Sequence, residues 1–183
     1  MLERLNAKRF NVAGFRNAKI ENVDSIIEGV REVLGELDFQ LFDADKIAGR
    51  RHLYLAALNA LAAFKGKYMI SRSLGVEATL YASCQRQISR AFEMVGLNPK
   101  TSRIAILIFY GDEDFEAILN RVKKVIPGVR DDKILEEWTS RIGELKKIYS
   151  VSEVEFKAAQ QALGENEAEA FLRLLWERMA LLG

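Results

Sequence analysis

The sequence contains one cysteine and one histidine in 183 residues, and this scarcity excludes several kinds of site. A lone cysteine, Cys84, cannot form a disulfide within the chain, which is typical of proteins in a reducing cytosol. Structural zinc sites usually need about four cysteine or histidine ligands. We therefore expect no structural disulfide and no metal site.

Two motifs that hold nucleotide phosphates are also missing. The chain has no G-x-x-x-x-G-K-[ST] loop and no G-x-G-x-x-G turn after a predicted strand, so it shows no phosphate-binding loop of these two types. We expect no cofactor and no small-molecule substrate. It has no run of about 18 uncharged apolar residues, so we expect no membrane span. The opening MLERLNAKRFNV lacks the apolar run and cleavage site of a secretory signal, and we expect a cytoplasmic protein.

Apolar residues make up 49% of the chain and charged residues 29%, and there are only two prolines. This composition is typical of a folded globular protein. A chain of this length buries about 70% of the surface that it exposes when unfolded. Because we find no internal repeat and no low-complexity linker, we expect a single domain over residues 1–183.

Hydrophobic periodicity predicts an α/β fold. Strands are predicted at Phe10–Phe15, Asp38–Phe42 and Ile104–Tyr110, and the uninterrupted apolar character of the last one indicates a central strand covered on both faces. We expect a small mixed β-sheet packed with helices, followed by a helical C-terminal part. The predicted helices are Val23–Leu34, Leu53–Phe64, Leu74–Val95, one that Asp112 caps and that ends near Pro127-Gly128, Ile134–Ile148, one opened by the capping box at Ser152, and Glu167–Leu182.

Positive charge is concentrated in the middle of the chain. Residues 44–103 hold 10 Lys and Arg against 3 Asp and Glu, although the formal net charge of the whole chain is only +1. This asymmetry indicates an anionic partner. The alternative is a solvated cationic face with ordinary ion pairs, and composition by itself favours that alternative.

The basic residues lie around the ends of two predicted helices. If these helices pack antiparallel, Arg86 and Arg90 return towards Arg50 and Arg51 and form a concave site. Guanidinium groups would then hold the phosphates of a single-stranded nucleic-acid end, while amides and a ring would meet its bases. His52 has three interpretations: a helix start, a satisfied half-buried ring or a ligand contact. The predicted RNA-binding residues are Lys46, Arg50, Arg51, His52, Arg72, Gln85, Arg86, Gln87 and Arg90.

Catalytic groups are scarce in this sequence. A nucleophile needs a base beside it, and Cys84 with His52 is the one pair that the sequence offers. A cysteine on an apolar helix line is usually a small core residue, so we rank this pair far below a binding function. We therefore expect a protein that is not an enzyme.

The central block carries a set of short motifs at fixed separations. They are Asp43-Ala44, Ile47-Ala48, His52-Leu53, Ala56, Ala60, Ile70-Ser71, Glu77, Ala82-Ser83, Arg86-Gln87-Ile88, Ala91 and Gly96. With these residues the chain resembles the kinase-binding subunit of the KEOPS complex, the family of the PRPK-binding protein. The similarity is strongest over residues 38–110, and the closing Met-Ala-Leu-Leu also matches the family. Cys84 departs from the pattern, because we expect glycine at this position.

The resemblance implies a function that composition does not show. Proteins of this family are not catalysts: they bind the amino-terminal lobe of an atypical kinase/ATPase subunit and help to recruit tRNA by holding its 3′ CCA end. The complex transfers a threonylcarbamoyl group to the adenosine beside the anticodon, and another subunit makes the transfer. Of the predicted RNA-binding residues, the resemblance itself supports Arg86 and His52.

The resemblance also implies an apolar surface for the kinase. Leu74–Val95 carries two apolar lines, which predict either deep burial or one face for the core and another for a partner. The alternative to the whole hypothesis is a purely protein-binding adaptor or regulator of a kinase without RNA contact. The predicted kinase-binding residues are Val76, Leu80, Met94 and Leu97.

Overall fold

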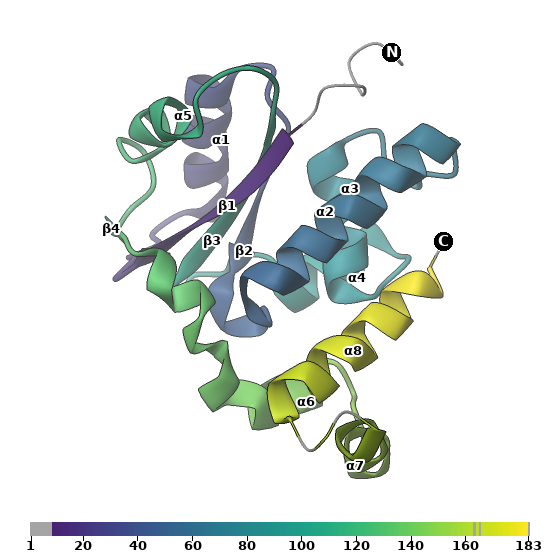
Figure 1. Ribbon diagram of the computed structural model, residues 1–183. Helices are drawn as coiled ribbons and strands as arrows, with labels where there is room; N and C mark the ends of the chain where they lie inside the picture. The colour runs from purple at the N-terminus through teal and green to yellow at the C-terminus, as the bar shows by residue number, and fades with distance from the viewer. Residues whose placement is uncertain (1–8, 163, 165, 183) are drawn as a thin grey trace.

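Figure 1 shows the computed structural model, which describes residues 9–162, 164 and 166–182. The strands are β1 (Arg9–Arg16), β2 (Phe39–Asp43), β3 (Ile104–Tyr110) and β4 (Val129–Arg130). The α-helices are α1 (Val23–Leu34), α2 (Gly49–Gly66), α3 (Leu74–Ser83), α4 (Ile88–Val95), α5 (Phe115–Val122), α6 (Ile142–Ile148), α7 (Glu153–Ala162) and α8 (Glu167–Ala180). The 3-10 helices are η1 (Ala44–Lys46), η2 (Asp132–Leu135) and η3 (Glu137–Arg141).

The four strands form one sheet in the order β2-β3-β1-β4. The α/β class is confirmed, but the expectation of a mixed sheet is wrong, because every strand pairing in the described residues is antiparallel. The reason lies in the connection through α1. It leaves β1 and β2 pointing the same way, and β3 then inserts between them, antiparallel to both.

Strand β3 separates two hydrophobic cores, as its apolar sequence predicts. Alternate residues such as Leu107 and Phe109 face the core that contains α2, α3 and α8, whereas Ile106 and Ile108 face the core that contains α1 and α5. Figure 1 shows α1 and α5 on one side of the sheet and the remaining α-helices on the other. All seven residues of β3 are buried, which confirms the predicted central strand.

Two predicted helices are interrupted. The segment Leu74–Val95 forms two helices, because Cys84 ends α3 in the left-handed region with φ 55°. The segment Ile134–Ile148 forms 3-10 turns before the single short helix α6. By contrast, the capping box is confirmed, since the Ser152 hydroxyl accepts the Glu155 N–H and the Glu155 carboxylate accepts the Ser152 N–H.

Candidate functional site

Helices α2 and α3 pack antiparallel, as the sequence hypothesis requires (Figure 1). Tyr149, at the end of α6, joins the start of α2 to the end of α3. Its hydroxyl lies 3.0 Å from the Lys46 carbonyl oxygen and 3.1 Å from the Ala82 carbonyl oxygen, so it can donate to either. The residues after α3 therefore return towards the start of α2.

His52 lies inside this junction and is fully buried. Its Nδ1 accepts the backbone N–H of Ala48 at 3.1 Å, and its ring meets Tyr149 edge-on with centroids 5.6 Å apart. Burial lowers the pKa of His52 to about 4, against a smaller raising effect of the Ala82 backbone. The ring is therefore a neutral core group, and it offers no surface to a ligand in this conformation.

The basic residues at the start of α2 are held by partners within the protein. Arg50 donates to the Val12 carbonyl oxygen at 2.8 Å and approaches Glu136 at 3.5 Å. Arg51 pairs with Glu169 and lies over the ring of Trp176. These two guanidinium groups therefore reach different neighbours: Arg50 reaches β1 and the residue between η2 and η3, whereas Arg51 reaches α8.

Lys46 is also partly engaged, because its Nζ lies 3.7 Å from the buried carboxylate of Asp43. That carboxylate accepts hydrogen bonds from Thr101 at 3.0 Å and Asn98 at 3.2 Å. Lys46 thus belongs to a hydrogen-bonded junction at the end of β2. Neither Lys46 nor the two arginines of α2 is free to bind an anion without giving up an existing contact.

A second group of basic side chains is exposed to solvent. Arg72 precedes α3, while Arg86 and Arg90 lie in the turn after α3 and in the first turn of α4. Within the described part of the chain these three side chains make no ion pair, and the same holds for Lys65 and Lys67 at the end of α2. The structure therefore divides the predicted basic site into an engaged group at the start of α2 and a free group around α3.

The two predicted glutamines differ in burial. Gln85 is half-buried and lines a shallow depression, whereas Gln87 is exposed at the start of α4. Sequence reasoning missed two exposed apolar side chains near Gln85, namely Tyr68 at 52% and Ile70 at 46% exposure. The signal was present, because Tyr-Met-Ile follows the Lys-Gly-Lys end of α2. The residues lining the depression are Tyr68, Ile70, Glu77, Leu80, Tyr81, Gln85 and Leu182.

The four predicted kinase-binding residues do not form one patch. Leu80 is 1% exposed and belongs to the core, so it presents no docking surface. Val76 lines a cleft between α1, β2 and α4, and Leu97 packs against the core on the α1 side of the sheet. Met94 is the one that borders an open apolar groove.

This groove has a volume of about 360 Å³ and lies between the α3–α4 turn, the end of α6 and the end of α8. Arg178 forms part of it and donates to the carbonyl oxygens of Tyr149 and Ser150. Its apolar lining includes Leu181, which is 80% exposed. The residues lining the groove are Ser83, Cys84, Gln85, Met94, Ile148, Tyr149, Ser150, Arg178, Leu181 and Leu182.

Cys84 is half-buried at the edge of this groove, where burial raises the pKa of its thiol to about 12. Its Sγ lies 3.8 Å from the Leu175 carbonyl oxygen. A nucleophilic cysteine needs a lowered pKa and a base beside it. The thiol of Cys84 and the neutral buried ring of His52 have the opposite properties, so this arrangement does not support a catalytic pair.

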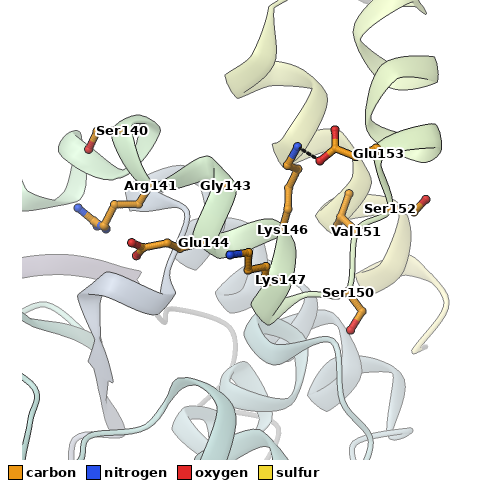
Figure 2. Close-up of a pocket in the computed structure, with 10 residues that line it drawn as sticks. All are labelled: Ser140, Arg141, Gly143, Glu144, Lys146, Lys147, Ser150, Val151, Ser152 and Glu153. Atoms are coloured by element: carbon orange, nitrogen blue, oxygen red, sulfur yellow. Dashed lines mark hydrogen bonds and ion pairs between the residues drawn. The ribbon is translucent and has the colours of Figure 1, made fainter.

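A larger hollow, of about 650 Å³, flanks α6 (Figure 2). Its charged lining is mostly engaged: Lys146 pairs with Glu153, and Arg141 donates to the Ala44 carbonyl oxygen. Figure 2 shows Arg141 and Lys146 extending to different sides of α6, so their charges do not meet. This hollow lacks a convergent set of free groups, and we do not regard it as the functional site.

Two further features are absent from the residues that the structure describes. Among them, no helix is both long and apolar enough to cross a membrane. Over the same residues, no three His, Cys, Asp or Glu side chains gather closely enough to hold a metal ion.

Comparison with known proteins connects this geometry to a family. The family model described as "Kinase binding protein CGI-121" matches residues 15–183. The chain is also similar to a protein named "Regulatory protein Cgi121" from Methanocaldococcus jannaschii, with 28% identity over 141 residues, 76% of this chain and 83% of that protein. These findings confirm the resemblance that the central motifs indicate. The chain belongs to the CGI-121 family of kinase binding proteins.

Proposed function

We propose that this protein is a non-catalytic subunit of the KEOPS complex that binds the kinase/ATPase subunit and recruits tRNA through its 3′ CCA end. In this role it would support threonylcarbamoyl transfer to the adenosine next to the anticodon, with the transfer made by another subunit. Membership of the CGI-121 family supports the kinase partner. The observation that carries the RNA role is the group of exposed cations around α3 that form no ion pair with any other described residue.

The RNA surface is best placed on the free cations. Arg72, Arg86 and Arg90 have no ion-pair partner to give up among the residues that the structure describes, whereas Arg50 and Arg51 would have to release theirs. A free guanidinium can neutralise a phosphate and release the counterions of that phosphate without breaking an existing ion pair. We therefore propose that His52, Lys46, Arg50 and Arg51 do not contact the RNA directly. Gln85 and Gln87 remain beside the proposed RNA site.

Salt dependence and a tRNA lacking its terminal CCA test this surface together. If three phosphates are neutralised on a single strand, the logarithm of affinity falls with the logarithm of salt concentration at a slope of about −2. We expect the Arg86→Gln, Arg90→Gln double variant to bind more weakly and with a shallower slope. Arg121→Gln is the matched control, because Arg121 pairs with Glu113 on the α5 side of the sheet. Equal binding to intact and CCA-less tRNA would contradict the proposal.

The kinase surface is best placed on the groove beside Met94 and Leu181. Exposed apolar side chains beside a hollow are typical of protein docking sites, and a charge there would be buried unpaired in the complex. We expect Leu181→Asp to abolish co-purification with the kinase while leaving the circular dichroism spectrum unchanged. Val154→Asp is the control, since Val154 is also 80% exposed but lies on α7. If both variants behave alike, the groove is not the docking site.

The alternative function is an adaptor that binds the kinase and no RNA. The exposed groove fits this function as well as it fits the first. A filter-binding assay with tRNA separates the two, because the adaptor would show neither CCA-dependent nor salt-dependent binding.

A further inference from the structure

The loop between α2 and α3 holds an aromatic side chain outward on a well-anchored backbone. The Tyr68 N–H donates to the Ala63 carbonyl oxygen at 3.1 Å. The buried Glu77 carboxylate then accepts the N–H groups of Ile70 at 3.0 Å and Ser71 at 2.7 Å. The loop backbone is therefore tied at both of its ends, yet the Tyr68 side chain remains half in solvent.

Gly66 provides a seat for the Tyr68 ring. A Cβ placed on Gly66 would lie 2.4 Å from a carbon of that ring, closer than any real contact allows. The ring consequently packs directly against the backbone of the last turn of α2. A side chain seated in this way loses little conformational entropy when a flat group stacks on its outer face.

The surroundings of this ring are cationic. Lys65, Lys67 and Arg72 lie within the same segment, 65–73, which contains no acidic residue. None of the three forms an ion pair with another described residue. Lysine is depleted in the cores of protein interfaces, whereas an aromatic ring among free cations is the usual platform for single-stranded nucleic acid.

We propose that the Tyr68 ring, seated against Gly66, is the surface on which a base of the tRNA 3′ end stacks. The unpaired cations of the segment 65–73 neutralise the adjoining phosphates. Glu77 acts as a positioning residue, because it holds the loop backbone and touches no RNA. This inference rests on the proposed tRNA-binding function and adds to it a residue that stacks on the face of a base.

Three single variants test the stacking. We expect Tyr68→Ala to weaken binding of CCA-ended tRNA about 10-fold, the loss that removal of one stacked base produces. Tyr68→Phe should bind like the wild type, because stacking uses the ring and not the hydroxyl. Neither variant removes a cation, so the salt slope should stay the same. Lys67→Gln should lower the slope instead, which separates stacking from charge.

Gly66→Ala extends the test without touching the ring itself. The added methyl group displaces the ring, so this variant should also bind the CCA end more weakly. In a Tyr68→Ala background the same substitution should have no further effect, because no ring then packs against residue 66. Additive losses in this cycle would overturn the seating argument, and circular dichroism of each variant confirms that the fold is kept.

The outcomes distinguish failure of the stacking inference from failure of the proposed function. If the wild type does not distinguish intact from CCA-less tRNA, the proposed function fails. If the wild type does distinguish them but Tyr68→Ala binds equally well, only the stacking inference fails. If Tyr68→Ala loses the kinase in co-purification and keeps its RNA affinity, the ring belongs to the protein interface and the inference is overturned.

Discussion

The neutral His52 ring makes folding stability depend on pH. The pKa of this buried residue is about 4, against an ordinary value of 6.5, so between these values the unfolded chain binds a proton that the folded chain does not. The stabilisation is complete above about pH 6.5 and is lost as the pH falls towards 4. For His52 alone the loss amounts to about 3 kcal/mol. Chemical denaturation at a series of pH values measures it.

Carboxylates also titrate in this range, so a variant is needed to isolate His52. In His52→Asn the amide oxygen can still accept the N–H of Ala48, but no group at this position titrates. We expect the variant to be less stable at pH 7 and to lose less stability on acidification. Identical pH dependence of the two proteins would show that His52 does not contribute.

Cys84 occupies a backbone conformation that favours glycine. With φ 55° its Cβ costs about 1 kcal/mol relative to glycine, and the side chain recovers part of this by packing at the core. Both Cys84→Gly and Cys84→Ala lack the sulfur, so the difference between their stabilities isolates the cost of a Cβ in this backbone conformation. We expect the glycine variant to be the more stable of the two by about 1 kcal/mol in denaturant titration. Higher stability of the alanine variant would refute the assignment of strain.

The sequence does not reveal which ion-pair partner each charged residue has in the folded protein. The local surplus of cations is readable from composition, but Arg50 and Arg51 are neutralised by Glu136 and Glu169, which lie far along the chain. Only the tertiary fold brings those carboxylates to the start of α2. For the same reason the free cations around α3 could be named from the sequence but not told apart from the engaged ones.

At the scale of elements, sequence periodicity locates helices better than it locates their ends. Helix α1 and strand β3 have the bounds that their apolar patterns predict. The break between α3 and α4 carries neither glycine nor proline, and both apolar lines continue across it. The expectation of glycine at Cys84, which came from the family pattern, was the one indication of a helix end there.

The loop between α2 and α3 depends on one carboxylate. In Glu77→Ala the part-buried N–H of Ile70 and the buried N–H of Ser71 lose their acceptor, which costs about 2 kcal/mol. Glu77→Gln retains an amide oxygen in the same place and should cost less. Hydrogen exchange is the direct measurement: the amides of these two residues should exchange much faster in the alanine variant alone. Unchanged protection would mean that other contacts hold the loop.

The whole molecule is organised around β3, and this could be predicted only in part. Seven consecutive apolar residues indicate a strand buried on both faces, which the structure confirms. The sequence does not reveal that β3 lies between β1 and β2, because strand order depends on contacts between distant segments. It also leaves β4 unmarked, since this strand has only two residues.

The core assignment of Leu80 leads to a prediction for the folded molecule as a whole. Leu80→Arg buries an unpaired charge and should destabilise the protein by at least about 3 kcal/mol, enough to unfold a domain of marginal stability. Leu58→Arg is the control, because Leu58 is 53% exposed on α2. Circular dichroism and thermal unfolding compare the two. A well-folded Leu80→Arg protein that fails to bind the kinase would restore Leu80 to the docking surface.

The pairing of Arg9 with Tyr110 has a consequence for biosynthesis. Neither of the first two strands has its neighbour until β3 has been made and has left the ribosome. At about 5 to 20 residues per second, the interval between β1 and β3 lasts about 5 to 20 seconds. During that time the nascent chain carries unmatched strand edges, which other chains and chaperones can recognise. The nascent chain can therefore form its sheet only after the seven residues of β3 have been synthesised.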